Sequence, residues 1–149
     1  MNNPIIYKSD YVFEIGKAIT LREGMDVSII STGSMVDSAL KAAALLETDG
    51  ISAEVVNMHT IKPLDVYAVE KACAKKLIVT VEEHSKIGGL GSAVAEVLTS
   101  NTRRPIQIIL GTRNGYLHAG DFQYMLESHG LTSLQIAKEI SNTYKEVVK

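Results

Sequence analysis

The chain has 149 residues, a formal net charge of −2 and a hydrophobic content of 46%. This length fits one ordinary domain with a single core. The near-neutral charge lacks the basic footprint of proteins that bind nucleic acid or anionic membranes. We therefore expect neither of these partners.

Further classes are excluded by the apolar and cysteine patterns. No apolar stretch approaches the ~18 residues that a membrane-spanning helix needs. The first residues lack the basic start and the apolar run of a signal peptide. Cys73 is the only cysteine, so the chain cannot form an internal disulfide. These features favour a cytoplasmic protein.

Strand-like and helix-like patterns alternate in the first half of the chain. Residues 27–30 form a short β-branched run, which predicts a strand. Residues 35–46 carry apolar side chains at three- and four-residue steps, which predicts a helix closed by Gly50. Residues 53–57 indicate a second strand. Pro63 suits the first turn of the helix that follows.

The second half continues the alternation. Residues 77–81 are apolar on both faces, as central parallel strands are. A glycine-rich stretch then leads into a helix over 93–98, and residues 105–110 predict the last strand. A helix over 122–126 precedes Gly130, and Thr132 begins a capping box for the final helix. The buried stripe of that helix is predicted to be Leu134, Ala137, Ile140, Tyr144 and Val148.

This alternation predicts an α/β fold with a doubly wound parallel sheet and helices on both faces. Residues 1–10 are predicted to be a linker or arm, and residues 11–149 to form one domain. Ligands of such sheets bind beyond the carboxyl ends of the strands, so residues at these ends are the candidates for a site.

The first candidate follows the strand over 27–30. Thr32, Gly33 and Ser34 offer hydroxyls and backbone N–H groups at a helix N-terminus, a combination that suits an anion. Simple helix capping, with Gly33 making the turn, is the alternative interpretation.

The second candidate follows the strand over 77–81. The acidic pair with its neighbouring imidazole suits acid–base chemistry, although a solvated loop whose carboxylates meet helix N-termini or a partner chain is the alternative. The glycine spacing does not match a dinucleotide-binding fingerprint. The candidate residues are Glu82, Glu83, His84, Gly88, Gly89 and Gly91.

The third candidate is the long connection over residues 111–121. It carries Arg113, His118 and Asp121, and such loops often make functional contacts. His118 and Asp121 would supply only two metal ligands, so no metal site is predicted. His59 and His129 are interpreted as structural or surface histidines.

A set of short strings, in unbroken order over residues 11–141, resembles the C-terminal domain of transketolase. Similar domains end 1-deoxyxylulose-5-phosphate synthases and pyruvate dehydrogenase β-subunits. The strings are Gly16-Lys17-Ala18, Arg22-Glu23-Gly24 with Asp26, Thr32-Gly33-Ser34, Ile61-Lys62-Pro63-Leu64-Asp65, Val81-Glu82-Glu83-His84, Gly88-Gly89-Leu90-Gly91-Ser92 and Gly130-Leu131-Thr132 followed by Ile136. The loop over residues 111–120 departs from the family pattern.

The resemblance implies a three-layer α/β/α fold with a mixed five-stranded sheet in the order 1-3-2-4-5. Strand 1 would be antiparallel to the others and would comprise residues 18–21. In that order the loops over 32–34 and 82–91 would face one crevice at the switch point between two strands.

The resemblance also implies ketol transfer between sugar phosphates, with thiamine diphosphate and Mg²⁺ bound in the full enzyme. The family's Gly-Asp-Gly cofactor motif is missing, since Gly120-Asp121 is followed by Phe122. We therefore assign no catalytic, cofactor-binding or metal-binding residue to this chain. We expect it to be inactive alone, to pair with N-terminal transketolase domains or a subunit, and to form a homodimer. Its role would be dimer assembly and support of the catalytic domains.

Two other functions stay open. The chain could be a stand-alone regulatory module that binds a small anion or a nucleotide in the crevice between residues 32–34 and 82–91. It could also be an independent small enzyme that uses Glu83 and His84.

Overall fold

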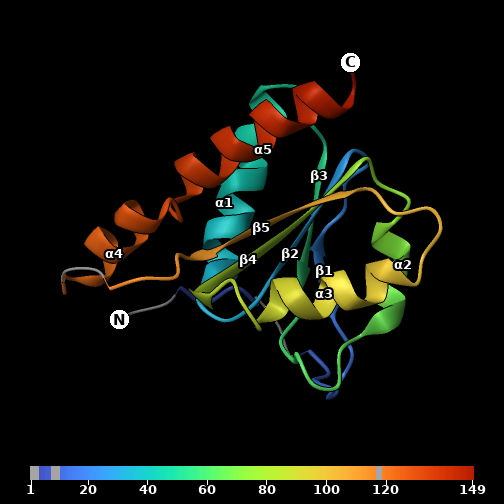
Figure 1. Ribbon diagram of the computed structural model, residues 1–149, viewed down its shortest axis with the longest axis horizontal. Helices are drawn as coiled ribbons and strands as arrows, with labels where there is room; N and C mark the ends of the chain where they lie inside the picture. The colour runs from blue at the N-terminus through green and yellow to red at the C-terminus, as the bar shows by residue number, and fades with distance from the viewer. Residues whose placement is uncertain (1–3, 8–10, 117–118) are drawn as a thin grey trace.

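The computed structural model describes residues 4–7, 11–116 and 119–149. Strands and helices alternate as the periodicity predicts, and Figure 1 shows their arrangement. In chain order they are β1 (Ile19–Arg22), β2 (Val27–Ser31), α1 (Met35–Thr48), β3 (Ala53–Asn57), α2 (Val66–Ala72), β4 (Leu77–Ser85), α3 (Leu90–Thr99), β5 (Ile106–Thr112), α4 (Phe122–His129) and α5 (Ser133–Val147).

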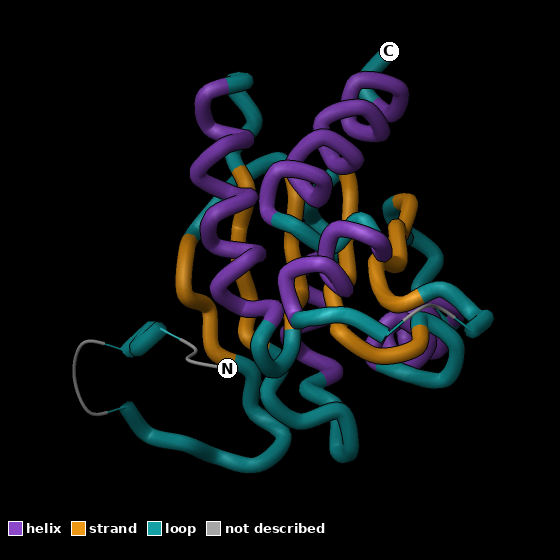
Figure 2. Tube along the Cα trace, turned by 90° about the vertical axis from the view of Figure 1, so that its left-hand side faces the viewer, coloured by secondary structure: helices purple, strands orange, loops and turns teal. Residues whose placement is uncertain are grey.

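The strands form one mixed sheet in the order β1-β3-β2-β4-β5, with β1 antiparallel to β3 and the other pairs parallel. This confirms the fold expected from the family resemblance. In the central register, Ile29 of β2 lies between Val55 of β3 and Val79 of β4. Figure 2 shows the strands side by side with helices packed over them. The chain reverses its winding between β2 and β4, which makes this pair the switch point.

Two apolar clusters, one on each face of the sheet, explain the three layers. Val27 and Ile29 point toward α1 and α5, whereas Ile30 and Ile78 belong to the cluster beneath α2 and α3. Successive side chains of a strand point to opposite faces, so strands that are apolar throughout need helices on both sides. Figure 1 shows α1 beside α5 on one side, and α2 beside α3 on the other.

Several boundaries differ from the sequence predictions. The helix after Pro63 begins only at Val66, because the Asp65 carboxylate accepts a hydrogen bond from the Ala68 N–H (3.1 Å) and caps it. The same carboxylate accepts a bond from the Ala18 N–H (2.8 Å) and so ties the start of β1 to α2. Strand β1 lies one residue later than predicted, and β4 continues to Ser85 rather than ending at 81.

The predicted stripe of α5 is wrong at both ends. Leu134 is 68% exposed and Val148 is 45% exposed, whereas Ile136 and Ile140 are wholly buried. The capping box at Thr132 is confirmed, and it begins the helix so that Ile136 rather than Leu134 faces α1 and the sheet. Within the described residues, no helix is long and apolar enough to cross a bilayer.

Candidate functional site

Glu82 is completely buried where β4 emerges from the core. One carboxylate oxygen accepts a hydrogen bond from the Leu90 N–H (2.7 Å), and the other accepts one from the Gly91 N–H (2.9 Å). These two N–H groups open α3, where the helix dipole favours a negative charge. The chain's own carboxylate therefore takes the place that a bound anion would occupy at this helix N-terminus.

The glycine string beside Glu82 is explained by close packing. A Cβ at Gly89 would collide with the Glu82 carboxylate, and one at Gly91 would collide with the side chain of Ile109. Gly88 has a φ of +80°, a backbone conformation that favours glycine. Its N–H donates to the Ser92 hydroxyl at 2.8 Å. The glycines thus let α3 begin directly against the sheet and the buried carboxylate.

His84 lies beside the same carboxylate. Its Nε2 is 2.7 Å from an oxygen of Glu82, and its side chain is about half exposed. Both Glu82 oxygens already accept backbone hydrogen bonds, which favours a structural role for this carboxylate.

The loop after β2 reaches the end of β4. The Ser34 hydroxyl hydrogen-bonds to the Glu83 carboxylate, and the Thr32 N–H donates to the Val81 carbonyl at 3.3 Å. Gly33, with a φ of +61°, makes the turn between β2 and α1. The structure thus joins the two predicted loops at the switch point through Ser34 and Glu83.

The glycines of the two loops line different hollows in the described structure. Gly33 and Ser34 line a small hollow of about 260 Å³ beneath residues 4–7. Gly88 and Gly89 line a separate groove of about 900 Å³ between α2 and α3. A single crevice bounded by both loops stays a prediction.

The loop over 111–120 begins as an extension of β5. The Arg113 N–H donates to Nδ1 of His129 at 3.2 Å, which ties this loop to the end of α4. Asp121 caps α4 by accepting a hydrogen bond from the Tyr124 N–H (2.8 Å). His118 lies outside the described residues. Asp121 therefore has a structural role as the N-cap of α4, which the sequence pattern did not identify.

Unpaired polar atoms gather near the carboxyl ends of β2 and β3. The Ser31 hydroxyl, the Asn57 Oδ1 and both ring nitrogens of His59 are buried without a hydrogen-bond partner among the described residues. The ring of Phe13 lies 4.4 Å from the imidazole of His59, and the Asn57 amide donates to the Tyr7 hydroxyl at 2.8 Å. The sequence indicates a structural or surface role for His59, yet its ring nitrogens lack partners here.

A polar cluster at the opposite end of the sheet has no counterpart among the sequence predictions. Asp26 accepts hydrogen bonds from the Ser52 N–H (3.0 Å) and from the Tyr144 hydroxyl (2.7 Å). The Ser52 bond, followed by the Tyr144 bond, lowers the pKa of Asp26. Burial, together with the bond to Asp26, raises the pKa of Tyr144 to about 12. A separation of 118 residues leaves no local pattern to reveal this pair.

The described residues do not fit a Mg²⁺–thiamine diphosphate site. A hard divalent ion of this kind needs several oxygen ligands. Among residues 4–7, 11–116 and 119–149, no group of three or more His, Cys, Asp or Glu side chains is placed to hold a metal ion. The buried carboxylate of Glu82 is already used by the backbone of α3.

A family model described as "Transketolase, C-terminal domain" matches residues 16–136, which include every strand of the sheet. The chain belongs to the transketolase C-terminal domain family. It is 43% identical over 144 residues to a putative transketolase C-terminal section of Methanocaldococcus jannaschii, covering 95% of this chain and 45% of that protein. It is 46% identical over 138 residues to the 6-deoxy-6-sulfo-D-fructose transketolase subunit SqwH of Clostridium sp. (strain MSTE9), covering 92% of this chain and 41% of that subunit.

A solved structure described as "Split gene transketolase, inactive beta4 tetramer" superposes on this transketolase C-terminal domain with a TM-score of 0.86. The two sequences are 37% identical, and the match covers 95% of this chain and 46% of that chain. The domain thus spans less than half the length of these relatives.

Proposed function

We propose that this domain is the C-terminal part of a thiamine-diphosphate-dependent transketolase that transfers ketol units between sugar phosphates in the cytoplasm. In this proposal it supports dimer assembly and braces the catalytic domains, which hold the thiamine diphosphate and Mg²⁺. It does not catalyse the reaction alone.

The observation that carries this proposal is an exposed apolar segment ahead of β1. Val12 is 88% exposed, Ile15 is 67% exposed and Phe13 is 55% exposed. Figure 2 shows this segment as a loop that runs past one end of the strands. Clustered exposed apolar side chains mark a surface that a partner covers. The family's catalytic domains precede this domain, so this segment is where they would pack.

The unpaired polar atoms near this segment support the proposal that a partner domain packs here. The His59 ring, whose nitrogens lack partners among the described residues, lies against Phe13 of the apolar segment, and Asn57 with its unpaired Oδ1 contacts Tyr7. A buried polar group without a partner costs about 1–3 kcal/mol. A neighbouring domain can supply the missing donors and acceptors while it covers the apolar side chains.

The relatives support an inactive isolated chain. The Clostridium relative is a transketolase subunit, a relative from Phocaeicola vulgatus is a subunit of an apulose-4-phosphate transketolase, and the split-gene structure is described as an inactive tetramer. These relatives carry more than twice the matched length, so the domain lacks a large part of what they contain.

The test is a ketol-transfer assay with and without the complementary polypeptide. The purified chain with thiamine diphosphate, Mg²⁺ and sugar phosphates should show no turnover, and the complementary transketolase polypeptide should bind it and restore activity. Turnover by the isolated chain would disprove the proposal.

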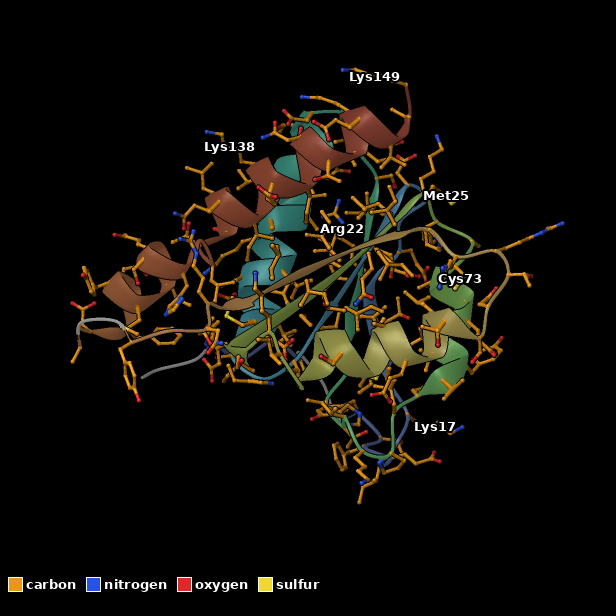
Figure 3. All side chains as sticks on the ribbon, in the orientation of Figure 1. Lys17, Arg22, Met25, Cys73, Lys138 and Lys149 are labelled. Atoms are coloured by element: carbon orange, nitrogen blue, oxygen red, sulfur yellow. The ribbon has the colours of Figure 1, made fainter. Side chains whose placement is uncertain are left out.

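The interface is tested with Val12→Asp/Ile15→Asp, which places two charges in the apolar segment. We expect binding of the complementary polypeptide to weaken at least about tenfold, because two desolvated charges would lack partners. Met25→Asp is the control, since Met25 is 79% exposed at another part of the surface, labelled in Figure 3. Equal effects of both variants would contradict a specific interface.

The alternative, an anion- or nucleotide-binding module at the predicted crevice, stays a prediction. The local charge weighs against it, because Glu83 and Asp37 already lie at the start of α1 and Glu82 lies at the start of α3. An anion added there would meet three carboxylates.

A further inference from the structure

A second groove lies on the other side of β4, between the edge strand β5 and α5. It has a volume of about 540 Å³, within the range of small-molecule sites. Its floor is formed by Ile108, Ile109 and Leu110 of β5. The groove shares Lys86 with the predicted loop over 82–91, and it includes no residue of the proposed interface.

The groove collects positive charge from three separate parts of the chain. Lys86 follows β4, Arg113 follows β5, and Lys138 lies on α5. Glu139 is the single carboxylate among the described residues that line the groove. Within the described part of the chain, none of the three cations lies within 4 Å of a carboxylate oxygen. In a chain with a net charge of −2, this is a local excess of unpaired cations.

His129 adds a fourth donor at the same groove. Its Nδ1 accepts the Arg113 N–H, so the neutral imidazole carries its proton on Nε2. That N–H is therefore available to a ligand, and the backbone bond holds the start of the Arg113 loop beside the ring. Gly111 and Gly130 also line the groove, and the lack of a side chain at Gly111 lets β5 pass close to the carbonyl of His84.

We propose that this groove binds a dianionic phosphate group, either free or carried by a small molecule. Arg113, Lys86 and Lys138 line the groove from three separate segments, and charge-assisted hydrogen bonds from Arg and Lys are the contacts that bind phosphate oxygens. The divergent loop over 111–120 would then have a defined role, which is to supply Arg113. This site is independent of the proposed interface, because it uses none of the same residues.

The site is tested by titrating the full chain with inorganic phosphate and, separately, with inorganic pyrophosphate at constant ionic strength. Calorimetry measures the affinity, and amide NMR shifts locate the site. We expect saturable binding, with the largest shifts at Gly111, Arg113 and Gly130. Saturation by phosphate indicates that the free ion suffices, and saturation by pyrophosphate alone indicates a longer ligand. No saturable binding of either probe would overturn the proposal.

The matched variants separate a built site from general charge. Arg113→Gln/Lys138→Gln should raise the dissociation constant about tenfold or more, because two charge-assisted hydrogen bonds are lost. Lys17→Gln/Arg104→Gln removes the same charge elsewhere and should change the affinity less than about twofold, because Arg104 is exposed ahead of β5. Figure 3 shows Lys17 and Lys138 on opposite sides of the molecule. Equal weakening by both pairs would overturn the proposal. None of the four side chains forms an ion pair with the described residues, and the NMR spectra verify that each variant is folded.

Discussion

One hydrogen bond, between Tyr144 and Asp26, joins the C-terminal helix α5 to the residue before β2. The Tyr144 hydroxyl donates to Asp26 at 2.7 Å, and the ammonium of Lys76 lies 5.7 Å from the centre of the Tyr144 ring. The bond therefore holds the last turns of α5 against the loop that precedes β2. Asp26 belongs to the family strings, whereas Tyr144 lies outside the residues that carry the resemblance.

The substitution Tyr144→Phe removes this hydroxyl and keeps the ring. We expect the free energy of unfolding to fall by about 1 kcal/mol, or somewhat more because the acceptor is charged. The pKa of Asp26 should rise toward its ordinary value of 3.8, since the Tyr144 bond is one of the contacts that lower it. Urea unfolding and carboxyl NMR titration measure the two effects. Tyr67→Phe, at a 75% exposed tyrosine, is the control and should change neither.

The stabilisation from the Tyr144–Asp26 bond should be lost at both low and high pH. The folded state lowers the pKa of Asp26, so the bond's stabilisation is present above pH 3.8 and is lost as the pH falls below it. The folded state raises the pKa of Tyr144 from 10.0 to about 12, so stability is also lost as the pH rises through that range. The difference between the native protein and Tyr144→Phe should shrink at both extremes. A constant difference would contradict this assignment.

Glu82 is the second residue whose role can be tested alone. Glu82→Gln replaces one acceptor oxygen with an NH₂ group that faces a backbone N–H at the start of α3. We expect a loss of about 2–3 kcal/mol in the free energy of unfolding, because a charge-assisted bond is lost at a buried position. Thermal and urea unfolding measure it. Glu83→Gln, at an exposed neighbour, is the control and should lose less than about 1 kcal/mol.

At the scale of a secondary-structure element, α5 tests the corrected apolar stripe. Ile136→Ala should lower the free energy of unfolding by about 2–5 kcal/mol, because Ile136 is wholly buried against the main core. Leu134→Ala should change it by no more than about 0.5 kcal/mol, because Leu134 is 68% exposed. Equilibrium unfolding of both variants measures this contrast. The reverse order would restore the stripe predicted from the sequence.

At the scale of the whole molecule, the proposed boundary at residue 10 can be tested by truncation. Deleting residues 1–10 removes the described bond between Tyr7 and Asn57 and the stack of Tyr7 on Tyr11, whose ring centroids lie 3.7 Å apart. All five strands and all five helices of the described structure remain. We expect a cooperative unfolding transition that is weaker by about 1–2 kcal/mol. A truncated chain without such a transition would show that the arm belongs to the folding unit.

The elements are largely predictable because their signals are local. Apolar spacing locates β2, α1, β3 and α3, and Thr132 marks the start of α5. Edge strand β1 has no such pattern, and it is expected only through the family resemblance. The predicted start of α2 is misplaced, because the Asp65 carboxylate that caps it also binds the backbone of β1.

The candidate site is only partly predictable. The sequence identifies the loops over 32–34 and 82–91, and the structure joins them through Ser34 and Glu83. The sequence does not show that the Glu82 carboxylate accepts the backbone N–H groups at the start of α3. Nor does it show that Gly33 and Gly88 line different hollows. Those outcomes depend on tertiary contacts around the end of β4, where its pairing with β5 is irregular between Val81 and Ser85, and periodicity does not encode such contacts.

By itself, the sequence determined the composition class, the alternation of strands and helices, and the ordered strings that place the chain in its family. Periodicity and capping depend on residues a few positions apart, so the sequence alone reveals them. Only the tertiary structure decided which charges meet. Asp26 with Tyr144, and Lys86 with Arg113 and Lys138, come from distant segments, and their proximity results from sheet order and helix packing. The physical reason is that charge and burial depend on distance in space, which chain position does not give.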